Sequence, residues 1–175
     1  MAMVKRLTLL RHAKAASDEG SLPDRDRPLT RRGRHDAPIM GRRLRAADTR
    51  PSLILTSPAI RALHTAKLVA REIGYPLEFL QREAELYLAS PDDILAVLAR
   101  QDDSFNHIIV CGHNPGMTDL ANRLTNAQID NIPTCGIVVI EALIREWRQL
   151  GRGGRLITFD YPKNRHVEPA PLERS

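Results

Sequence analysis

The chain has 175 residues, of which 42% are hydrophobic and 27% charged, a composition typical of one ordinary globular domain with its own core. No apolar run approaches the roughly 18 residues of a membrane span, and the N-terminus is too charged to be a signal peptide, so we predict a cytoplasmic protein that binds no membrane. The net charge of +5 suits either a solvated basic surface or an anionic partner, and an aromatic content of 4% argues against nucleic acid.

The N-terminal part of the chain predicts a strand followed by a helix. Residues 4–10 end in an apolar run that is typical of a buried strand. Residues 28–47 carry apolar and small side chains at helical spacing, and Thr30 is a suitable N-cap. Pro38 removes a backbone donor within this segment, so we expect it to kink or split the helix.

A second strand and helix follow directly. Residues 52–56 form a short apolar strand, and residues 58–74 have the pattern of an amphipathic helix. We expect Ser57 to cap this helix, Pro58 to occupy its first turn and Gly74 to end it.

The middle of the chain continues the alternation. Residues 76–80 predict a third strand, and residues 90–101 a helix with a cap, a proline and acids in its first turn. Residues 107–112 predict a buried strand, and residues 114–125 a helix whose cap is followed by proline. This order implies parallel strands with helices on both faces.

The last two predicted strands lie together, over residues 136–144 and 154–161, and suggest a hairpin with one antiparallel strand. Because no linker divides the chain, we expect one domain over residues 1–161. Residues 162–175 are polar and rich in proline, and we expect a loosely held tail.

Four cationic or near-cationic side chains lie just past predicted strands. Arg11 and His12 come after the first strand, Arg61 lies in the first turn of the helix that follows the second, and His113 comes after the strand over residues 107–112. Since the carboxyl ends of parallel strands meet at one edge of a sheet, these side chains should converge there. They would repel one another unless an anion joined them, and a phosphoryl group fits that requirement.

Five motifs, in order from about residue 5 to 125, resemble the histidine phosphatase (phosphoglycerate mutase-like) superfamily, and more narrowly its SixA-type phosphohistidine phosphatase branch. They are RHAK after the first strand, PLTRRG opening the first helix, TSPAIRALHTA, ELY at 85–87 and VCGHNPGM. The wider family usually has RHG where this chain has Arg11-His12-Ala13, a departure that the SixA-type branch tolerates. The resemblance implies an α/β fold, a three-layer α/β/α sandwich with a mostly parallel mixed central sheet.

The resemblance also implies roles for the four strand-end residues. His12 would be the nucleophile, attacking phosphorus to form a phosphohistidine that water then hydrolyses, provided that its other ring nitrogen is held. Arg11 and Arg61 would hold phosphoryl oxygens, and a protonated His113 would neutralise charge in the transition state. The expected ligand is a phosphorylated substrate, such as a phosphohistidine-bearing protein, and phosphate or sulfate should bind in the site.

Further candidates are less sharply defined by the sequence. Glu85 is the best match to the family's general acid, with Glu83 as a competitor. The imidazole of a protonated phosphohistidine, however, can leave without help from a strong acid. Ser17, Lys14 and Asn114 could line the rim, and Asn114 could equally be a helix cap. We expect His64 to face solvent and assign no role to His35, His107 or His166.

Rival chemistries leave few traces in the sequence. A cysteine-dependent phosphatase needs arginine six positions after its cysteine, where Cys111 is followed by Met117 and Cys135 by Glu141. No phosphate-binding Gly-Lys-Ser/Thr loop and no HExxH zinc helix occur, so we expect no metal and no cofactor. The alternatives that stay open are a broad small-molecule phosphomonoesterase or a mutase-like enzyme, and a phosphate-binding module without catalysis. The short loop over residues 13–27 predicts an open site, which favours the phosphatase.

Overall fold

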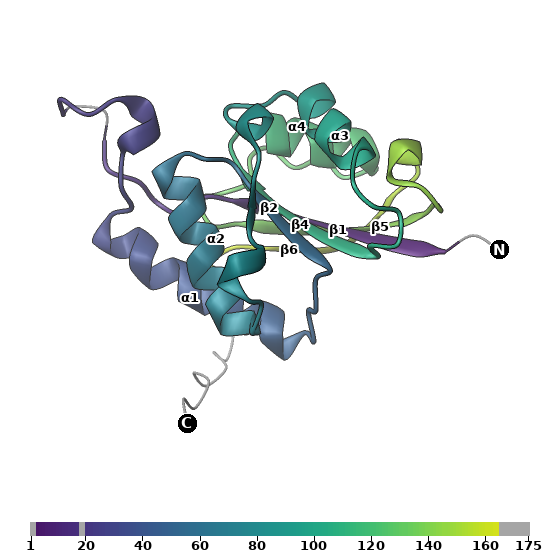
Figure 1. The fold of residues 1–175 in the computed structure, drawn as a ribbon, viewed down its shortest axis with the longest axis horizontal. Helices are drawn as coiled ribbons and strands as arrows, with labels where there is room; N and C mark the ends of the chain where they lie inside the picture. The colour runs from purple at the N-terminus through teal and green to yellow at the C-terminus, as the bar shows by residue number, and fades with distance from the viewer. Residues whose placement is uncertain (1–2, 18–19, 165–175) are drawn as a thin grey trace.

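A six-stranded mixed sheet forms the centre of the protein in a computed structural model that describes residues 3–17 and 20–164 (Figure 1). The strand order is β3-β2-β4-β1-β5-β6. The first four strands in this order run parallel, whereas β5 is antiparallel to both of its neighbours. The strands are β1 (Val4–Arg11), β2 (Leu53–Thr56), β3 (Gln81–Arg82), β4 (His107–Gly112), β5 (Ile137–Leu143) and β6 (Arg155–Asp160).

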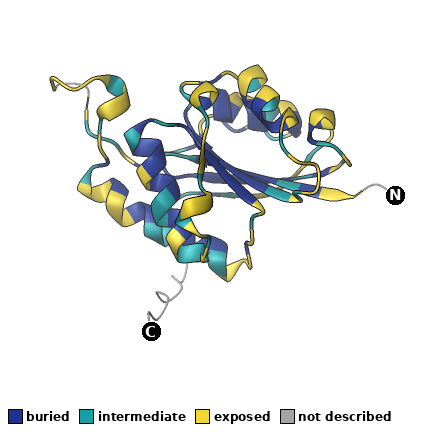
Figure 2. Ribbon diagram, in the orientation of Figure 1, coloured by how far each residue is buried: buried dark blue, intermediate teal, exposed yellow. Residues whose placement is uncertain are grey.

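Two layers of helices cover the sheet, with α1 and α2 on one face and α3 and α4 on the other (Figure 1). Residues of β1 alternate between the two resulting cores: Leu7 and Leu9 pack with α3 and α4, and Leu10 packs with α1 and α2. The four central strands of the sheet are buried along most of their length, whereas the edge strands β3 and β6 are mostly exposed (Figure 2). The expected three-layer α/β/α sandwich with a mostly parallel mixed sheet is confirmed. The helices are α1 (Arg31–Ala46), α2 (Ile60–Ile73), α3 (Pro91–Ala99) and α4 (Gly116–Leu124), with 3-10 turns η1 (Asp24–Asp26), η2 (Leu77–Phe79), η3 (Ala84–Leu86) and η4 (Trp147–Gln149).

Two expectations about local structure were wrong. Pro38 does not split α1, because Ala37 and Met40 on either side of it are fully buried and hold the helix in its layer. Residues 76–80 do not form a strand: they contain the turn η2, and pairing with β2 begins only at Gln81. Because β2 has four residues, a parallel strand beside it finds few backbone partners.

The remaining element predictions agree with the structure to within a few residues. β5 and β6 form the expected antiparallel hairpin, and Gly74 ends α2 with a left-handed backbone. No helix within residues 3–17 and 20–164 combines the length and hydrophobicity of a membrane span. Of the tail expected over residues 162–175, all but residues 162–164 lie outside the described residues, as does His166.

His107, at the start of β4, makes stability depend on pH. Its Nε2 lies 2.8 Å from the Thr8 hydroxyl, and burial lowers its pKa to about 4, aided by the charge of Arg6. An unfolded histidine titrates near 6.5, so unfolding takes up a proton between those values, and stability is lost as the pH falls from 6.5 towards 4.

We therefore expect His107→Gln, which can keep the bond to Thr8, to weaken this dependence. Between pH 7 and pH 5 the wild type should lose about 2 kcal/mol more unfolding free energy than the variant. Urea unfolding at both pH values measures this difference. The exposed His35→Gln variant is the control and should follow the wild type. Parallel losses in His107→Gln and wild type would contradict the prediction.

Candidate active site

Arg11, His12, Arg61 and His113 line one hollow of about 370 Å³ at the carboxyl edge of the parallel strands. The ring centroids of His12 and His113 lie 5.4 Å apart, and Arg61 Nη2 lies 3.4 Å from His113 Nδ1. We call this space the arginine–histidine hollow. The structure thus brings the four strand-end residues together, and their catalytic roles stay predictions.

Backbone pairing at the end of β1 fixes the position of His12. Arg11 pairs with Gly112 of β4, and the His12 N–H donates to the Gly112 carbonyl at 3.0 Å. On the other side, the Cys135 N–H donates to the His12 carbonyl at 3.0 Å. His12 is therefore held between two neighbouring segments of the chain.

The imidazole of His12 has one nitrogen held and one free. Its Nδ1 lies 2.8 Å from the Ala13 carbonyl, which can only accept, so the ring hydrogen is on Nδ1 and Nε2 keeps its lone pair. Burial lowers the pKa of His12 to about 4, and the charges of Arg61 and Arg11 act in the same direction. His12 is therefore neutral at pH 7, the protonation state that a nitrogen nucleophile needs.

His113 is held by both ring nitrogens. Its Nε2 lies 2.7 Å from the Ser57 hydroxyl, and Arg61 Nη2, which can only donate, points to its Nδ1. Burial lowers its pKa to about 3, with His12 and Arg61 contributing. The expected protonated His113 is thus not the form at pH 7 without a ligand, since protonation requires an anion beside the ring.

Ser57 has a different partner from the one predicted. The structure starts α2 at Ile60, with Ala59 as the capping residue, so neither Ser57 nor Pro58 has its expected place in the helix. The Ser57 hydroxyl instead bonds to His113 and accepts the Ala59 N–H at 3.2 Å. The helix begins later because its entry loop reaches towards β4.

Both arginines carry a buried nitrogen without a partner. Arg11 Nη1 donates to the Ile132 carbonyl at 2.7 Å, while Nε of Arg11 and Nε of Arg61 are among three buried side-chain atoms of the described residues that lack a hydrogen bond. A buried donor without a partner costs free energy, so both guanidinium groups are held in place at a cost. Burial also lowers the pKa of Arg11.

Three residues of the site were missed by sequence reasoning. Asp24 of η1 accepts from Arg61 Nη2 at 3.0 Å, from Arg27 Nη2 at 2.8 Å and from the Tyr87 hydroxyl. The backbone carbonyl of Asp24 accepts from Arg61 Nη1 at 2.7 Å. Bonds from Tyr87, then Arg27 and Arg61, hold the pKa of Asp24 well below its usual range. The available signals were the alternating charges of DRDRPLT, just before the first helix, for Asp24 and Arg27, and the ELY motif for Tyr87.

The two acid candidates lie outside the arginine–histidine hollow. Arg100 Nη2 lies 3.5 Å from Glu85 and 3.6 Å from Glu83, and neither carboxylate lines the hollow. The 3-10 turn η3 directs both side chains towards α3. The only described carboxylate that lines the hollow is the ionised Asp24.

The rim candidates divide into two groups. Lys14 and Asn114 line the hollow, whereas Ser17 is exposed and does not line it, and His64 faces solvent. Asn114 precedes α4, which begins at Gly116, and accepts from both the N–H and the hydroxyl of Thr118. Its amide donates at 2.9 Å to the Ile132 carbonyl that also holds Arg11. Asn114 therefore supports Arg11 as well as the helix start.

Comparison with known proteins agrees with this architecture. Residues 7–94 match the histidine phosphatase superfamily (branch 1). An uncharacterised protein of Mycobacterium tuberculosis is 32% identical over 165 residues, covering 88% of this chain and all of that protein. An uncharacterised chloroplastic protein of Arabidopsis thaliana is 31% identical over 153 residues, covering 83% of this chain and 70% of that protein.

Two solved structures extend the likeness to the fold. A protein given the name SixA from Agrobacterium tumefaciens superimposes with a TM-score of 0.74 at 30% identity, covering 90% of this chain and 98% of that one. The protein histidine phosphatase SixA complexed with tungstate gives a TM-score of 0.76 at 22% identity, covering 91% and 98%. The chain therefore belongs to the histidine phosphatase superfamily, branch 1, and is of the SixA type.

Proposed function

We propose that this protein is a metal-independent phosphatase that uses His12 as nucleophile, and that its substrate is a phosphohistidine carried by a protein. The family and its SixA neighbours support phosphatase activity. The observation that carries the nucleophile is the bond from His12 Nδ1 to the Ala13 carbonyl, which leaves Nε2 unprotonated beside Arg11 and Arg61. Their cationic side chains attract the phosphoryl group to that nitrogen.

The proposed reaction has two steps. His12 Nε2 forms a bond to phosphorus while the bond from phosphorus to the leaving group breaks, and the leaving group departs with its electron pair. Water then attacks the phosphohistidine, which releases inorganic phosphate and restores neutral His12. Arg11 and Arg61 hold the phosphoryl oxygens through the cationic guanidinium groups with which they line the hollow. The same anion raises the pKa of His113, which allows its protonated form to stabilise the transition state.

The carboxylates around the site favour phosphohistidine over an alkyl phosphate. An alkyl oxygen needs a proton from an acid as it leaves. Glu83 and Glu85 lie outside the hollow beside Arg100, and Asp24 is held in its ionised form. A protonated imidazole leaves as a neutral molecule and needs no such acid. A broad phosphomonoesterase or mutase would therefore find no proton donor in the hollow among the residues that the structure describes.

Replacing the proposed nucleophile tests the function directly. We expect His12→Ala to lower hydrolysis of a phosphohistidine carrier protein by about a thousandfold or more, because covalent catalysis is lost. Brief incubation with a ³²P-labelled carrier should label the wild type with an acid-labile, base-stable phosphate, and should leave His12→Ala unlabelled. Chelation with EDTA should change neither result.

The controls separate this function from its rivals. The exposed His35→Ala variant should keep full activity. The wild-type protein should turn over 3-phosphoglycerate and nucleoside monophosphates far more slowly than phosphohistidine. Equal rates for wild type and His12→Ala would reject the nucleophile, and faster turnover of an alkyl phosphate would reject the substrate class.

A second prediction concerns Asp24, the carboxylate that shares Arg61 with the ligand. Asp24→Asn removes a negative charge from the hollow, so we expect orthophosphate to bind about tenfold more tightly. Without phosphate the variant should lose about 2 kcal/mol of unfolding free energy, because buried Arg61 loses its counter-charge. Isothermal titration calorimetry and urea unfolding measure the two effects. The exposed neighbour Asp26→Asn, which makes the same change of charge, is the matched control. Weaker phosphate binding in Asp24→Asn would contradict the prediction.

A further inference from the structure

A second hollow, of about 460 Å³, lies next to the arginine–histidine hollow. Lys14 and Thr134 line both spaces, so the two hollows meet along these side chains. The remaining lining of the second space is given by Arg32, Asp36, Pro133, Tyr161, Pro162 and Lys163, and we call it the lysine hollow. A substrate held at His12 can therefore extend into it.

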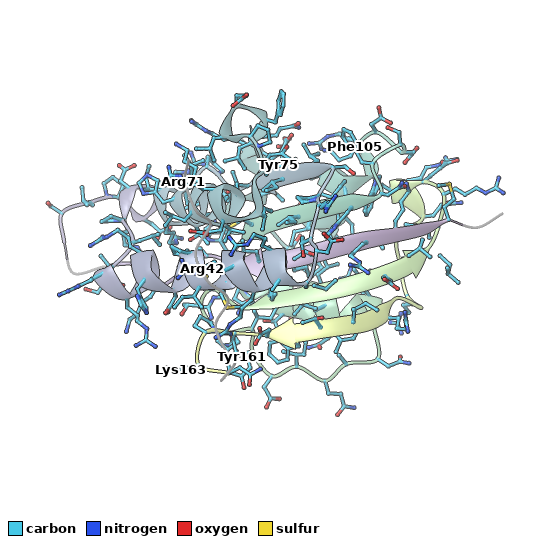
Figure 3. All side chains as sticks on the ribbon, turned by 90° about the horizontal axis from the view of Figure 1, so that it is seen from below. Arg42, Arg71, Tyr75, Phe105, Tyr161 and Lys163 are labelled. Atoms are coloured by element: carbon cyan, nitrogen blue, oxygen red, sulfur yellow. The ribbon has the colours of Figure 1, made fainter. Side chains whose placement is uncertain are left out.

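Buried contacts fix the walls of the lysine hollow. Arg43, whose side chain is 7% exposed, donates to the Tyr161 carbonyl at 2.9 Å and to the Pro162 carbonyl at 3.3 Å, and it pairs with the equally buried Asp160. The residues after β6 are thereby tied to α1, and Figure 3 shows Tyr161 and Lys163 at this place beside the helix.

The opposite walls are fixed by backbone hydrogen bonds. Thr30 N–H donates to the Lys14 carbonyl at 2.9 Å, and Gly136 N–H donates to the Pro133 carbonyl at 2.8 Å. Gly33 lies so close to Lys14 that a Cβ there would stand 2.3 Å from its carbonyl oxygen. The walls of the lysine hollow therefore come from four separate segments of the chain, at residues 14, 32–36, 133–134 and 161–163.

The charge of the lysine hollow is predominantly positive. Three of its side chains are cationic and one is a carboxylate, Asp36, which accepts from Arg32 Nε at 3.1 Å. The ammonium groups of Lys14 and Lys163 make no hydrogen bond or ion pair with any residue that the structure describes. Both lysines are exposed, so an anion can reach them from solvent.

We propose that the lysine hollow binds an acidic side chain of a protein substrate, close in sequence to the phosphorylated residue that enters the arginine–histidine hollow. The proposal rests on the proposed function, because it takes His12 as the point where the phosphoryl group is bound. Tyr161, Pro133 and Pro162 provide an apolar flank for the methylene groups of a glutamate, while the lysines bind its carboxylate. The hollow thereby selects acidic phosphoproteins over neutral ones.

Binding can be measured apart from catalysis. We would prepare peptides that carry a non-hydrolysable phosphonate analogue of phosphohistidine, flanked by either glutamate or glutamine. By fluorescence anisotropy at low salt, the wild type should bind the glutamate peptide about fivefold more tightly, the range of an exposed charge pair. This preference should fall as salt is added, because the charges are screened.

Lys163 is the test residue, since it lines the lysine hollow and not the arginine–histidine hollow. Lys163→Gln should bind the two peptides nearly equally, and Lys163→Glu should prefer the glutamine peptide. Arg152→Gln is the control, because it removes an exposed positive charge that lines neither space. Equal binding of both peptides by the wild type, or a preference unchanged in Lys163→Gln, would overturn the proposal.

Turnover of the corresponding true phosphohistidine peptides separates the two claims. Hydrolysis without a glutamate preference would reject the lysine hollow and leave the proposed function standing. A glutamate preference in binding that Lys163→Gln abolishes, without any hydrolysis, would support the hollow and reject the phosphatase.

Discussion

A buried guanidinium needs a counter-charge, and Arg61 obtains it from Asp24. The Arg61 side chain is 3% exposed, and a charge in that position is unfavourable unless it is paired and hydrogen-bonded. The backbone carbonyl and the carboxylate of Asp24 accept hydrogen bonds from two nitrogens of the Arg61 guanidinium group. The short turn η1 is thereby tied to α2, and Arg27 and Tyr87 are drawn to the same carboxylate. One ion pair thus organises three separate segments around the arginine–histidine hollow.

The same burial sets the protonation of both histidines. Desolvation is the largest cause of the lowered pKa of His12 and of His113, and the neighbouring arginines add to it. The hollow is therefore lined by two neutral imidazoles, by the guanidinium groups of Arg11, Arg27 and Arg61 and by Lys14, with Asp24 as the one carboxylate among the described residues. A phosphoryl group bound there would add negative charge beside these cations. The site is in this sense built around an anion that the protein itself only partly replaces.

What the sequence could predict follows from regular geometry. Parallel strands end at one edge of a sheet, so Arg11, His12, Arg61 and His113 could be brought together from strand positions alone. The helix caps at Thr30 and Ser90 could likewise be predicted, since a cap depends on residues that are close in the sequence.

What it could not predict depends on irregular segments that fold back over long distances. Asp24 lies in an irregular segment without periodicity and bonds to Arg61, which is 37 positions away in the sequence. Tyr87 bonds to Asp24 across a separation of 63 positions. Glu85 matched the family's acid by position, but the direction of its side chain was set by η3 and by Arg100. Pro38 failed as a helix breaker because the burial of its neighbours outweighed one lost hydrogen bond.

The positions of Asp24 and of the two glutamates bear on the choice of substrate. Since Asp24 is tied to Arg61, Arg27 and Tyr87, it cannot hold a proton for a leaving oxygen without weakening the pairing on which the site depends. The two acids predicted from the sequence, Glu83 and Glu85, are paired with Arg100 outside the hollow. Among the described residues, the only carboxylate that lines the hollow is fixed as a counter-ion, and this arrangement suits leaving groups that arrive with their own proton. The imidazole of a protonated phosphohistidine is such a leaving group, whereas the alkoxide of a sugar or glycerate is not. The structural role of Asp24 thereby narrows the range of substrates that suit the site.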